Sequence, residues 1–391
     1  MPSAFAENPS APMCINKADP NNTQLLESIS ANRDPLRLAY LVSKKEKTAQ
    51  KNDSNVCPET DPFKKQIKTI SRVLAQATGQ NIEAKAAPQP KSAKETAYVP
   101  TGPRPALIKK ECIKASLQRA PGNTGYTCDA DNTPKPYGTA GGATLQCVTD
   151  ETADYITFSV NKAIQCMSPK QPIDSRVLYT KINNESGFNF SLASPGGVSS
   201  PQLTTRGAGE VGHPTKGNGH YLLQEIIDSK NPACEPFKNI ARQDLKDSPL
   251  PITRAKYCDW INPGNGLARS LVYSIGLYLT QRDYYIIPAV EKRAPSLTKN
   301  RGVMNALSAI AYGREGVDHA KWLLQKYRVD KNTTASRLRK ELLHGSEYLK
   351  EMEDKTREAA CINRGLHPSS NKCEGLKLSQ SQLDGDECVT K

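Results

Sequence analysis

A glutamate at the end of an apolar stripe is the residue whose type and spacing best suit chemistry. Leu178, Ile182 and Glu185 are spaced to share one face of a helix. Phe188 and Phe190 follow closely. Among apolar side chains a carboxyl group favours its protonated form, which suits a general acid acting on a poor leaving group. Glu185 is therefore our candidate catalytic residue; the alternative is a glutamate at a frayed helix end that points to solvent.

The blocks around this glutamate carry a family resemblance. Residues 185–189 read Glu-Ser-Gly-Phe-Asn, residues 193–203 contain Ser-Pro-Gly-Gly-Val and then Gln-Leu, and residues 305–317 read Asn-Ala-Leu-Ser-Ala-Ile-Ala-Tyr-Gly-Arg-Glu-Gly-Val. Gly-Leu-Tyr-Leu stands between them at 276–279. In order and spacing these blocks resemble the motifs of the lytic transglycosylase and goose-type lysozyme family, which cleaves the glycan strand of peptidoglycan.

The resemblance implies a lysozyme-like, α-rich catalytic domain and a role for Glu185. This residue would protonate the oxygen between N-acetylmuramic acid and N-acetylglucosamine. The matching positions would bind substrate: Ser186, Gln202, Tyr278, Ile310 and Tyr312. Ile310 departs from the family pattern, which has a tyrosine there, and residues 199–201 depart as well. A site that lacks a polar contact accepts a glycan that lacks the matching group, so we hypothesise a preference for modified peptidoglycan, such as a de-N-acetylated wall.

The acceptor decides the product. Attack by the muramoyl 6-hydroxyl would give a 1,6-anhydro sugar, as a lytic transglycosylase does, and attack by water would make the enzyme a lysozyme. Positioning a water calls for a second carboxylate. Glu210, Glu225, Asp228 and Glu315 are available, and the sequence leaves open which of them faces Glu185.

The elements that must position these residues are mainly helical. Apolar residues at three- and four-residue spacing predict helices, and strand-like alternation is scarce. The expected helices cover 61–77, 150–167, 172–184, 221–228, 267–282, 303–312, 317–327 and 333–361. A Ser/Gly/Pro-rich loop is expected over 187–219, and Trp260 and Trp322 are expected in the core.

Composition divides the chain into five parts. We expect a polar N-terminal region with short helices, a Pro/Ala/Lys-rich linker, a cysteine-containing segment packed on the catalytic domain, the lysozyme-like domain itself, and a C-terminal helix with a cysteine-containing tail. Their boundaries are 1–85, 86–105, 106–170, 171–330 and 331–391.

Cysteine use predicts disulfides. The chain has 11 cysteines, none in a Cys-x-x-Cys pair, and no Cys/His group has zinc spacing. We therefore expect disulfide-braced flanking segments and an oxidising compartment, with one cysteine left over. Residues 4–6 read Ala-Phe-Ala, the form of a signal-peptidase site. A periplasmic or secreted protein whose signal peptide has been removed is expected.

The charge balance favours an anionic partner. Among 391 residues, Lys and Arg exceed Asp and Glu by 53 − 40 = 13. The basic residues are scattered and no nucleic-acid-binding motif accompanies them, so we expect peptidoglycan and not nucleic acid as the partner. We also expect no membrane span, no metal, no cofactor and a monomer. Two other functions stay open: a non-catalytic wall-binding or structural protein on a lysozyme-like scaffold, and a secreted, disulfide-rich protein that binds another protein.

Overall fold

The structure, a computed structural model, describes part of the chain. The described residues are 36–37, 39–40, 43, 104–118, 125–128, 134–137, 150–168, 173–188, 190, 193–194, 197–199, 202–212, 222–246, 260 and 266–390. The helix expected over 61–77 lies outside them, as does the linker expected over 86–105 apart from its last two residues.

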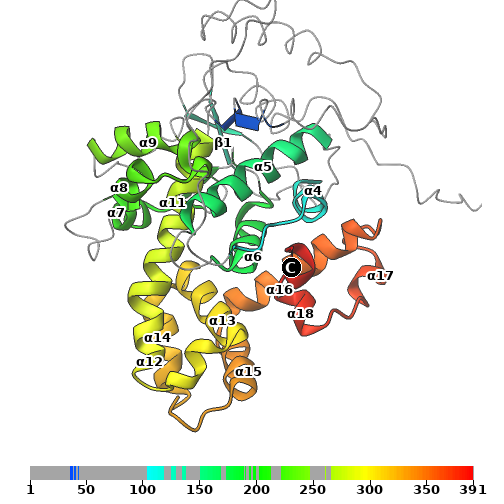
Figure 1. The fold of residues 1–391 in the computed structure, drawn as a ribbon. Coiled ribbons are helices and arrows are strands. Elements are labelled where there is room, and N and C mark those ends of the chain that lie inside the picture. Colours follow the sequence, from blue (N-terminus) through cyan, green and yellow to red (C-terminus); the bar gives the residue numbers. More distant parts are fainter. Residues whose placement is uncertain are drawn as a thin grey trace, which may run out of the picture.

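The described residues are mostly helical, which confirms the expectation of a mainly α fold. The helices are α4 (Lys110–Gln118), α5 (Asp150–Met167), α6 (Ser175–Ser186), α7 (Thr205–Gly212), α8 (Leu222–Asp228), α9 (Glu235–Lys246), α11 (Gly266–Thr280), α12 (Ile287–Glu291), α13 (Arg301–Tyr312), α14 (Gly316–Lys326), α15 (Ala335–Gly345), α16 (Glu347–Asn363), α17 (Asn371–Glu374) and α18 (Gln380–Leu383). Figure 1 shows α6 in the middle, with α7 to α9 on one side and α16 to α18 on the other.

Strands are few in this part of the chain. β1 (Gly125–Cys128) pairs antiparallel with β2 (Pro134–Tyr137), and β3 (Ala193–Ser194) pairs with β4 (Gly197–Val198). Within the described ranges, no helix combines the length and apolar character that crossing a membrane requires.

α11 is the central helix of the core. All of its residues except Leu267 are buried, including Arg269, which pairs with Asp244 at 2.9 Å. It packs against α5, α7, α9 and α13. Gly276 allows this closeness, because a Cβ there would lie 2.7 Å from Val211 Cγ1 of α7 and 2.5 Å from Leu222 Cδ2 of α8. A six-residue π-helix, η4 (Gln281–Ile286), continues α11.

α6 has a defined start and end. The Asp174 side chain accepts a hydrogen bond from the Arg176 amide as the N-cap. Gly187 ends the helix in the left-handed conformation, with φ 58°, and its amide donates to the carbonyl of Asn183. Glu185 therefore stands in the last turn, where the predicted apolar stripe ends.

Two predictions of secondary structure are wrong. The single helix expected over 333–361 is two helices, because Ser346 caps α16 by accepting from the Leu349 amide, and a Cβ at Gly345 would overlap the hydroxyl of Tyr327. The loop expected over 187–219 contains α7. The glycines of α7 interrupt its apolar pattern, so periodicity does not predict this helix. Ala208 and Val211 are nevertheless buried on one side of α7.

The two tryptophans differ. Trp260 is buried and packs edge-on against Tyr273 at 5.0 Å between ring centroids, which confirms the prediction. Trp322 is 46% exposed, so its assignment to the core is wrong. The apolar stripe of α14 runs through Ala320, Leu323 and Leu324, and Trp322 falls beside it, stacked on His319 of the preceding turn.

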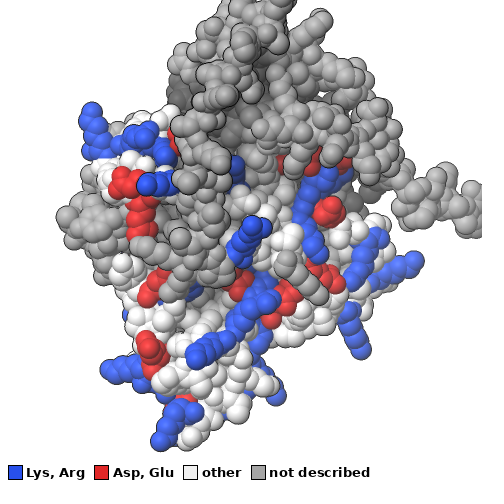
Figure 2. Space-filling view, in the orientation of Figure 1, with Lys and Arg blue, Asp and Glu red and all other residues white. Residues whose placement is uncertain are grey.

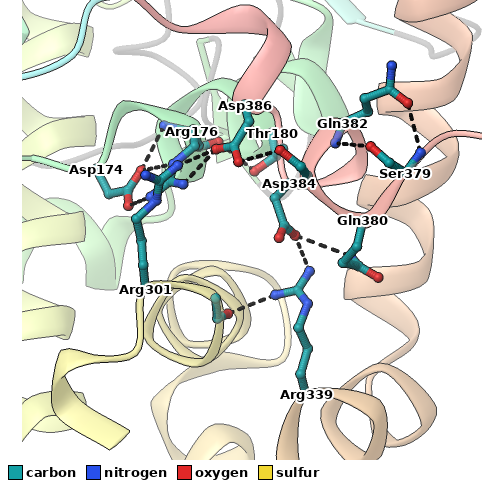
Figure 3. Close-up of polar contacts among 12 residues, drawn as sticks. Asp174, Arg176, Thr180, Arg301, Arg339, Ser379, Gln380, Gln382, Asp384 and Asp386 are labelled. Carbon is teal, nitrogen blue, oxygen red and sulfur yellow. Dashed lines mark hydrogen bonds and ion pairs between the residues drawn. The ribbon is translucent and has the colours of Figure 1, made fainter. Parts of the chain in front are cut away.

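The C-terminal segment is tied to the rest of the described chain. Disulfides join Cys112 to Cys388, Cys166 to Cys234 and Cys361 to Cys373, as the cysteine pattern led us to expect. Close by, Ile108 and Val389 form a β-bridge. Figure 3 shows the polar cluster that accompanies this connection, with Asp384 and Asp386 receiving arginines from α6, α13 and α15.

Candidate functional site

A cleft of about 760 Å³ lies beside the end of α6. It is bounded by α6, α7, the segment before α7, α11 with its π-helix, and the turn between α13 and α14. The lining residues are Lys181, Glu185, Gly197, Gln202, Leu203, Thr204, Arg206, Gly207, Glu210, Leu277, Gln281, Tyr285, Ala311, Tyr312, Gly313, Arg314, Glu315, Gly316, Val317 and Asp318. Its volume is in the range of small-ligand sites, which run to about 1,000 Å³.

Glu185 is held by two donors at one oxygen. Lys181 Nζ lies 2.6 Å from Glu185 Oε1, and the Tyr348 hydroxyl donates to the same oxygen at 2.8 Å. The Glu185 side chain is 17% exposed. Among the described residues, Oε2 has no hydrogen-bond partner. The carboxyl group is therefore oriented through Oε1, and Oε2 is left for a ligand in the cleft.

Lys181 makes this environment different from the apolar one that the sequence predicts. Its side chain is only 6% exposed, and its ammonium group lies 5.1 Å from the ring centroid of Tyr312 and 5.2 Å from that of Tyr348. The two rings supply a cation–π environment for the buried charge. An ammonium group at hydrogen-bond distance stabilises a carboxylate, so the surroundings of Glu185 are more polar than the apolar stripe and the two phenylalanines predict.

Burial keeps both tyrosines in their phenol form. Desolvation raises the pKa of Tyr348 well above its ordinary value, and the charge of Glu185 adds to the effect. Desolvation also raises the pKa of Tyr312 far above the ordinary value. Tyr348 is therefore a hydrogen-bond donor to Glu185 across the whole range of pH in which proteins work.

Two residues of the α13–α14 turn place Tyr348. Glu315 accepts hydrogen bonds from the Ser346 hydroxyl and from the amides of Glu347, at 3.0 Å, and Tyr348, at 3.4 Å. A carboxylate at a helix N-terminus is favoured by the unpaired amides there. Gly313 supplies the space, because a Cβ at this position would overlap the Tyr348 ring.

Three of the six predicted site residues share the cleft wall. Glu185, Gln202 and Tyr312 line it. Gln202 is fixed in a left-handed conformation, with φ 51°, and its Nε2 donates to the Ser199 carbonyl at 2.8 Å.

The other three predicted residues lie behind that wall. Ser186 is buried, and its hydroxyl donates to the Ile182 carbonyl at 3.4 Å. Tyr278 is buried against Tyr312, with 5.9 Å between ring centroids. Ile310 is fully buried. These three therefore support the site from the core side of the helices that carry it.

Several residues in or beside the cleft have no counterpart among the sequence predictions. Lys181 could have been found, because it stands one helical turn before Glu185, where an ion pair is favourable. Tyr348 could not, since 163 residues separate it from its partner. Gln281 and Tyr285 reach the cleft from the π-helix, which no apolar periodicity predicts.

The four carboxylates considered as partners of Glu185 separate into two groups. Glu210 and Glu315 line the cleft, whereas Glu225 and Asp228 are not among its lining residues. Glu315 is engaged at the start of α16. In the described part of the chain, no cluster of three or more His, Cys, Asp or Glu side chains is arranged to hold a metal ion.

Comparisons with known protein families, with curated proteins and with solved structures find no match to this chain. Function is therefore inferred from the cleft and from the motif resemblance.

Proposed function

We propose that this protein is an exported muramidase with a lysozyme-like catalytic domain, which cleaves the β-1,4 bond between N-acetylmuramic acid and N-acetylglucosamine in peptidoglycan. One observation carries the proposal: Glu185, the glutamate of the Glu-Ser motif, lines a ligand-sized cleft, with Oε1 held by two donors and Oε2 without a partner among the described residues. A general acid must lie within hydrogen-bond reach of the atom that it protonates, and an oxygen without a partner on a residue that lines the cleft is available for that contact.

The chemistry would follow from that orientation. The protonated Oε2 of Glu185 gives its proton to the glycosidic oxygen as the bond to the anomeric carbon breaks. The electron pair of that bond goes to the leaving oxygen, and an oxocarbenium-like centre develops on the sugar. The carboxylate, stabilised by Lys181 and Tyr348, then takes the proton of the acceptor. The acceptor is the muramoyl 6-hydroxyl in a lytic transglycosylase and water in a lysozyme.

Substrate contacts would come from the cleft wall. Gln202 and Tyr312 line the same cleft as the acid, and Tyr348 supplies a hydroxyl to Glu185 although Ile310 supplies none. The phenol beside the acid thus comes from α16 and not from the motif at 305–317. This altered arrangement supports our hypothesis that the preferred glycan is modified, for example de-N-acetylated.

The charge of the protein suits an anionic wall. Its net charge is +13, and Figure 2 shows Lys and Arg side chains spread over the visible face among acidic ones. Scattered positive charge raises the local concentration of enzyme on a polyanion in a salt-dependent way. The disulfides support export into an oxidising compartment.

A second candidate function is a non-catalytic wall-binding protein. The observation that favours it is the ion pair between Lys181 and Glu185, because an ionised carboxylate has no proton to donate. In the muramidase mechanism the same contact stabilises the carboxylate that remains after proton transfer; in a protein that only binds the wall it would be a structural ion pair.

The test is digestion of purified sacculi, native and chemically de-N-acetylated, by the wild type and by Glu185→Gln. Glu225→Gln is the matched control, because Glu225 is an exposed carboxylate that does not line the cleft. We expect soluble fragments from the wild type and the control but not from Glu185→Gln, with faster release from the de-N-acetylated wall. Mass spectrometry then separates anhydro-muramoyl from reducing ends. Equal release by all three proteins would contradict the proposal.

A further inference from the structure

The side of α14 that faces solvent carries an aromatic ring that the proposed chemistry does not use. Asp318, Trp322 and Gln325 are exposed on this side, whereas Ala320 and Leu323 are buried on the opposite one. Trp322 is 46% exposed, although aromatic side chains of this size gain much from burial. A single exposed apolar residue is ordinary on a protein surface, so the surroundings of Trp322 decide whether it is a binding group.

This side of α14 continues the wall of the cleft. Asp318 lines the cleft, and Trp322 follows it one helical turn later, about 6 Å further along the axis. Tyr285 also lines the cleft, from the π-helix that packs against α14, and Lys321 Nζ lies 4.8 Å from the centroid of its ring. An elongated ligand that leaves the cleft past Tyr285 and Lys321 would therefore reach the indole of Trp322 next.

Two lysines place positive charge around this indole. Lys326 Nζ lies 4.6 Å from the ring centroid of Trp322, and Lys321 precedes Trp322 on the side of the cleft. Each ammonium group thus lies over an aromatic ring, where it can also attract a carboxylate of a ligand. His319 stacks on Trp322 at 5.2 Å between ring centroids, which restricts the orientation of the indole.

We propose that this side of α14 is a second glycan-binding surface, which holds the peptidoglycan strand where it leaves the cleft. The inference rests on the proposed function. The indole of Trp322 offers an apolar face to the C–H groups of a sugar ring. Asp318 and Gln325 offer hydrogen-bonding groups to its hydroxyls, and Lys321 and Lys326 attract the carboxylates of the wall.

A second contact on the same polymer changes which substrates bind well. Once a long strand occupies the cleft, its next sugars reach the surface of α14 at a high effective concentration. A short fragment that fills only the cleft gains nothing from it. The surface therefore favours long strands over the fragments that cleavage produces.

The first experiment measures binding without cleavage. Co-sedimentation with purified sacculi compares Glu185→Gln alone with Glu185→Gln that also carries Trp322→Ala, Trp322→Tyr or Lys340→Ala. Lys340→Ala is the control, because Lys340 is exposed on α15 and does not line the cleft. Trp322→Ala should weaken binding about tenfold, as truncation of a tryptophan at the centre of an interface does. Trp322→Tyr should keep most of the affinity, and Lys340→Ala should keep all of it.

Two further measurements separate the surface from the cleft and from the stem peptides. In the Glu185 wild-type background, Trp322→Ala should lose turnover on sacculi at low substrate concentration and keep it on soluble tetrasaccharides. Glycan strands from which an amidase has removed the stem peptides should compete with sacculi for the binding that depends on Trp322.

The inference is overturned if Trp322→Ala binds sacculi as well as Lys340→Ala, if it loses turnover equally on both substrates, or if the free glycan strands do not compete. Thermal unfolding checks the fold of Trp322→Ala, and Trp322→Gln replaces it under the same criteria if it unfolds. The proposed function fails separately, when the wild type forms no new glycan ends from either substrate. The binding comparison needs no cleavage, so it still decides for or against the surface.

Discussion

The two ends of α6 carry polar groups that are used differently. At the start, both oxygens of Asp174 accept hydrogen bonds from Arg176, which also donates to Asp386 at 2.6 Å. Asp386 Oδ2 accepts from Ser381 at 2.6 Å, so both of its oxygens are used as well. At the other end, Glu185 uses Oε1 twice, and its Oε2 has no partner among the described residues.

We interpret the hydrogen-bond network at the start of α6 as structural and the one at its end, around Glu185, as reactive. The network at the start of α6 is complete at both carboxylates and joins the C-terminal segment to the helix (Figure 3). Complete polar networks fix a fold. The network at the end of α6 is incomplete at Glu185, and Glu185 lines the cleft. Changes at the start should therefore alter stability, and changes at the end should alter turnover.

The largest effect is expected from the disulfide beside the first network. Replacing both Cys112 and Cys388 by serine should lower the free energy of unfolding by about 5 kcal/mol, because the bridge spans 276 residues. The control pair Cys361 and Cys373, which spans 12 residues, should lose only about 3 kcal/mol on the same model. Urea unfolding measures both, and equal losses would contradict an origin in chain entropy.

Asp386→Asn should weaken the first network without touching the cleft. Arg176 keeps Asp174 as a partner, so we expect a loss of about 1–2 kcal/mol, between the values for exposed and buried ion pairs. Turnover on peptidoglycan at low temperature should stay at the wild-type level. A loss of turnover in folded Asp386→Asn would show that the two ends of α6 are not independent.

Tyr348→Phe should lower turnover and leave stability almost unchanged, the reverse of the effect expected for Asp386→Asn. It removes the hydroxyl that donates to Glu185 and keeps the ring that packs on Lys181, so turnover should fall about tenfold, equivalent to about 1.4 kcal/mol, with little change in melting temperature. Tyr327→Phe is the matched control, because the Tyr327 hydroxyl has no hydrogen-bond partner among the described residues. Equal turnover of the two variants would remove Tyr348 from the site.

The smallest effect is expected at Glu353, beside the C-terminal segment. Desolvation raises the pKa of this carboxyl despite its contact with Gln380. A raised pKa in the folded state means a contribution to stability that is present at low pH and lost as pH rises through the folded value. Glu353→Gln should therefore raise the melting temperature at pH 7 by about 1–2 °C and leave it unchanged at pH 3. Calorimetry of the wild type and Glu353→Gln at the two pH values tests this prediction. A lower melting temperature for Glu353→Gln than for the wild type at pH 7 would contradict the burial argument.

The sequence predicts the local parts of this structure well. Periodicity locates α5, α11, α13 and α14, because each has a continuous apolar face. The stripe that ends at Glu185 locates the candidate acid. The break between α15 and α16 escapes prediction, since Ser346 reads as a helical residue until its capping role is known.

The contacts that complete both networks are beyond the reach of periodicity. Tyr348 meets Glu185, and Asp386 meets Arg176, only when distant helices pack together. Sequence spacing reports which residues share a face of one helix. It does not report which face of another helix, far along the chain, will supply the second donor.

The central claim is that Glu185 breaks a glycan bond rather than only contacting the wall. The most direct measurement uses one preparation of purified peptidoglycan. For the wild type and for Glu185→Gln, it records both co-sedimentation with the peptidoglycan and the formation of new glycan ends. We predict that the two proteins sediment equally and that only the wild type forms new ends. Equal binding with no new ends from either protein would contradict the claim and leave a wall-binding protein.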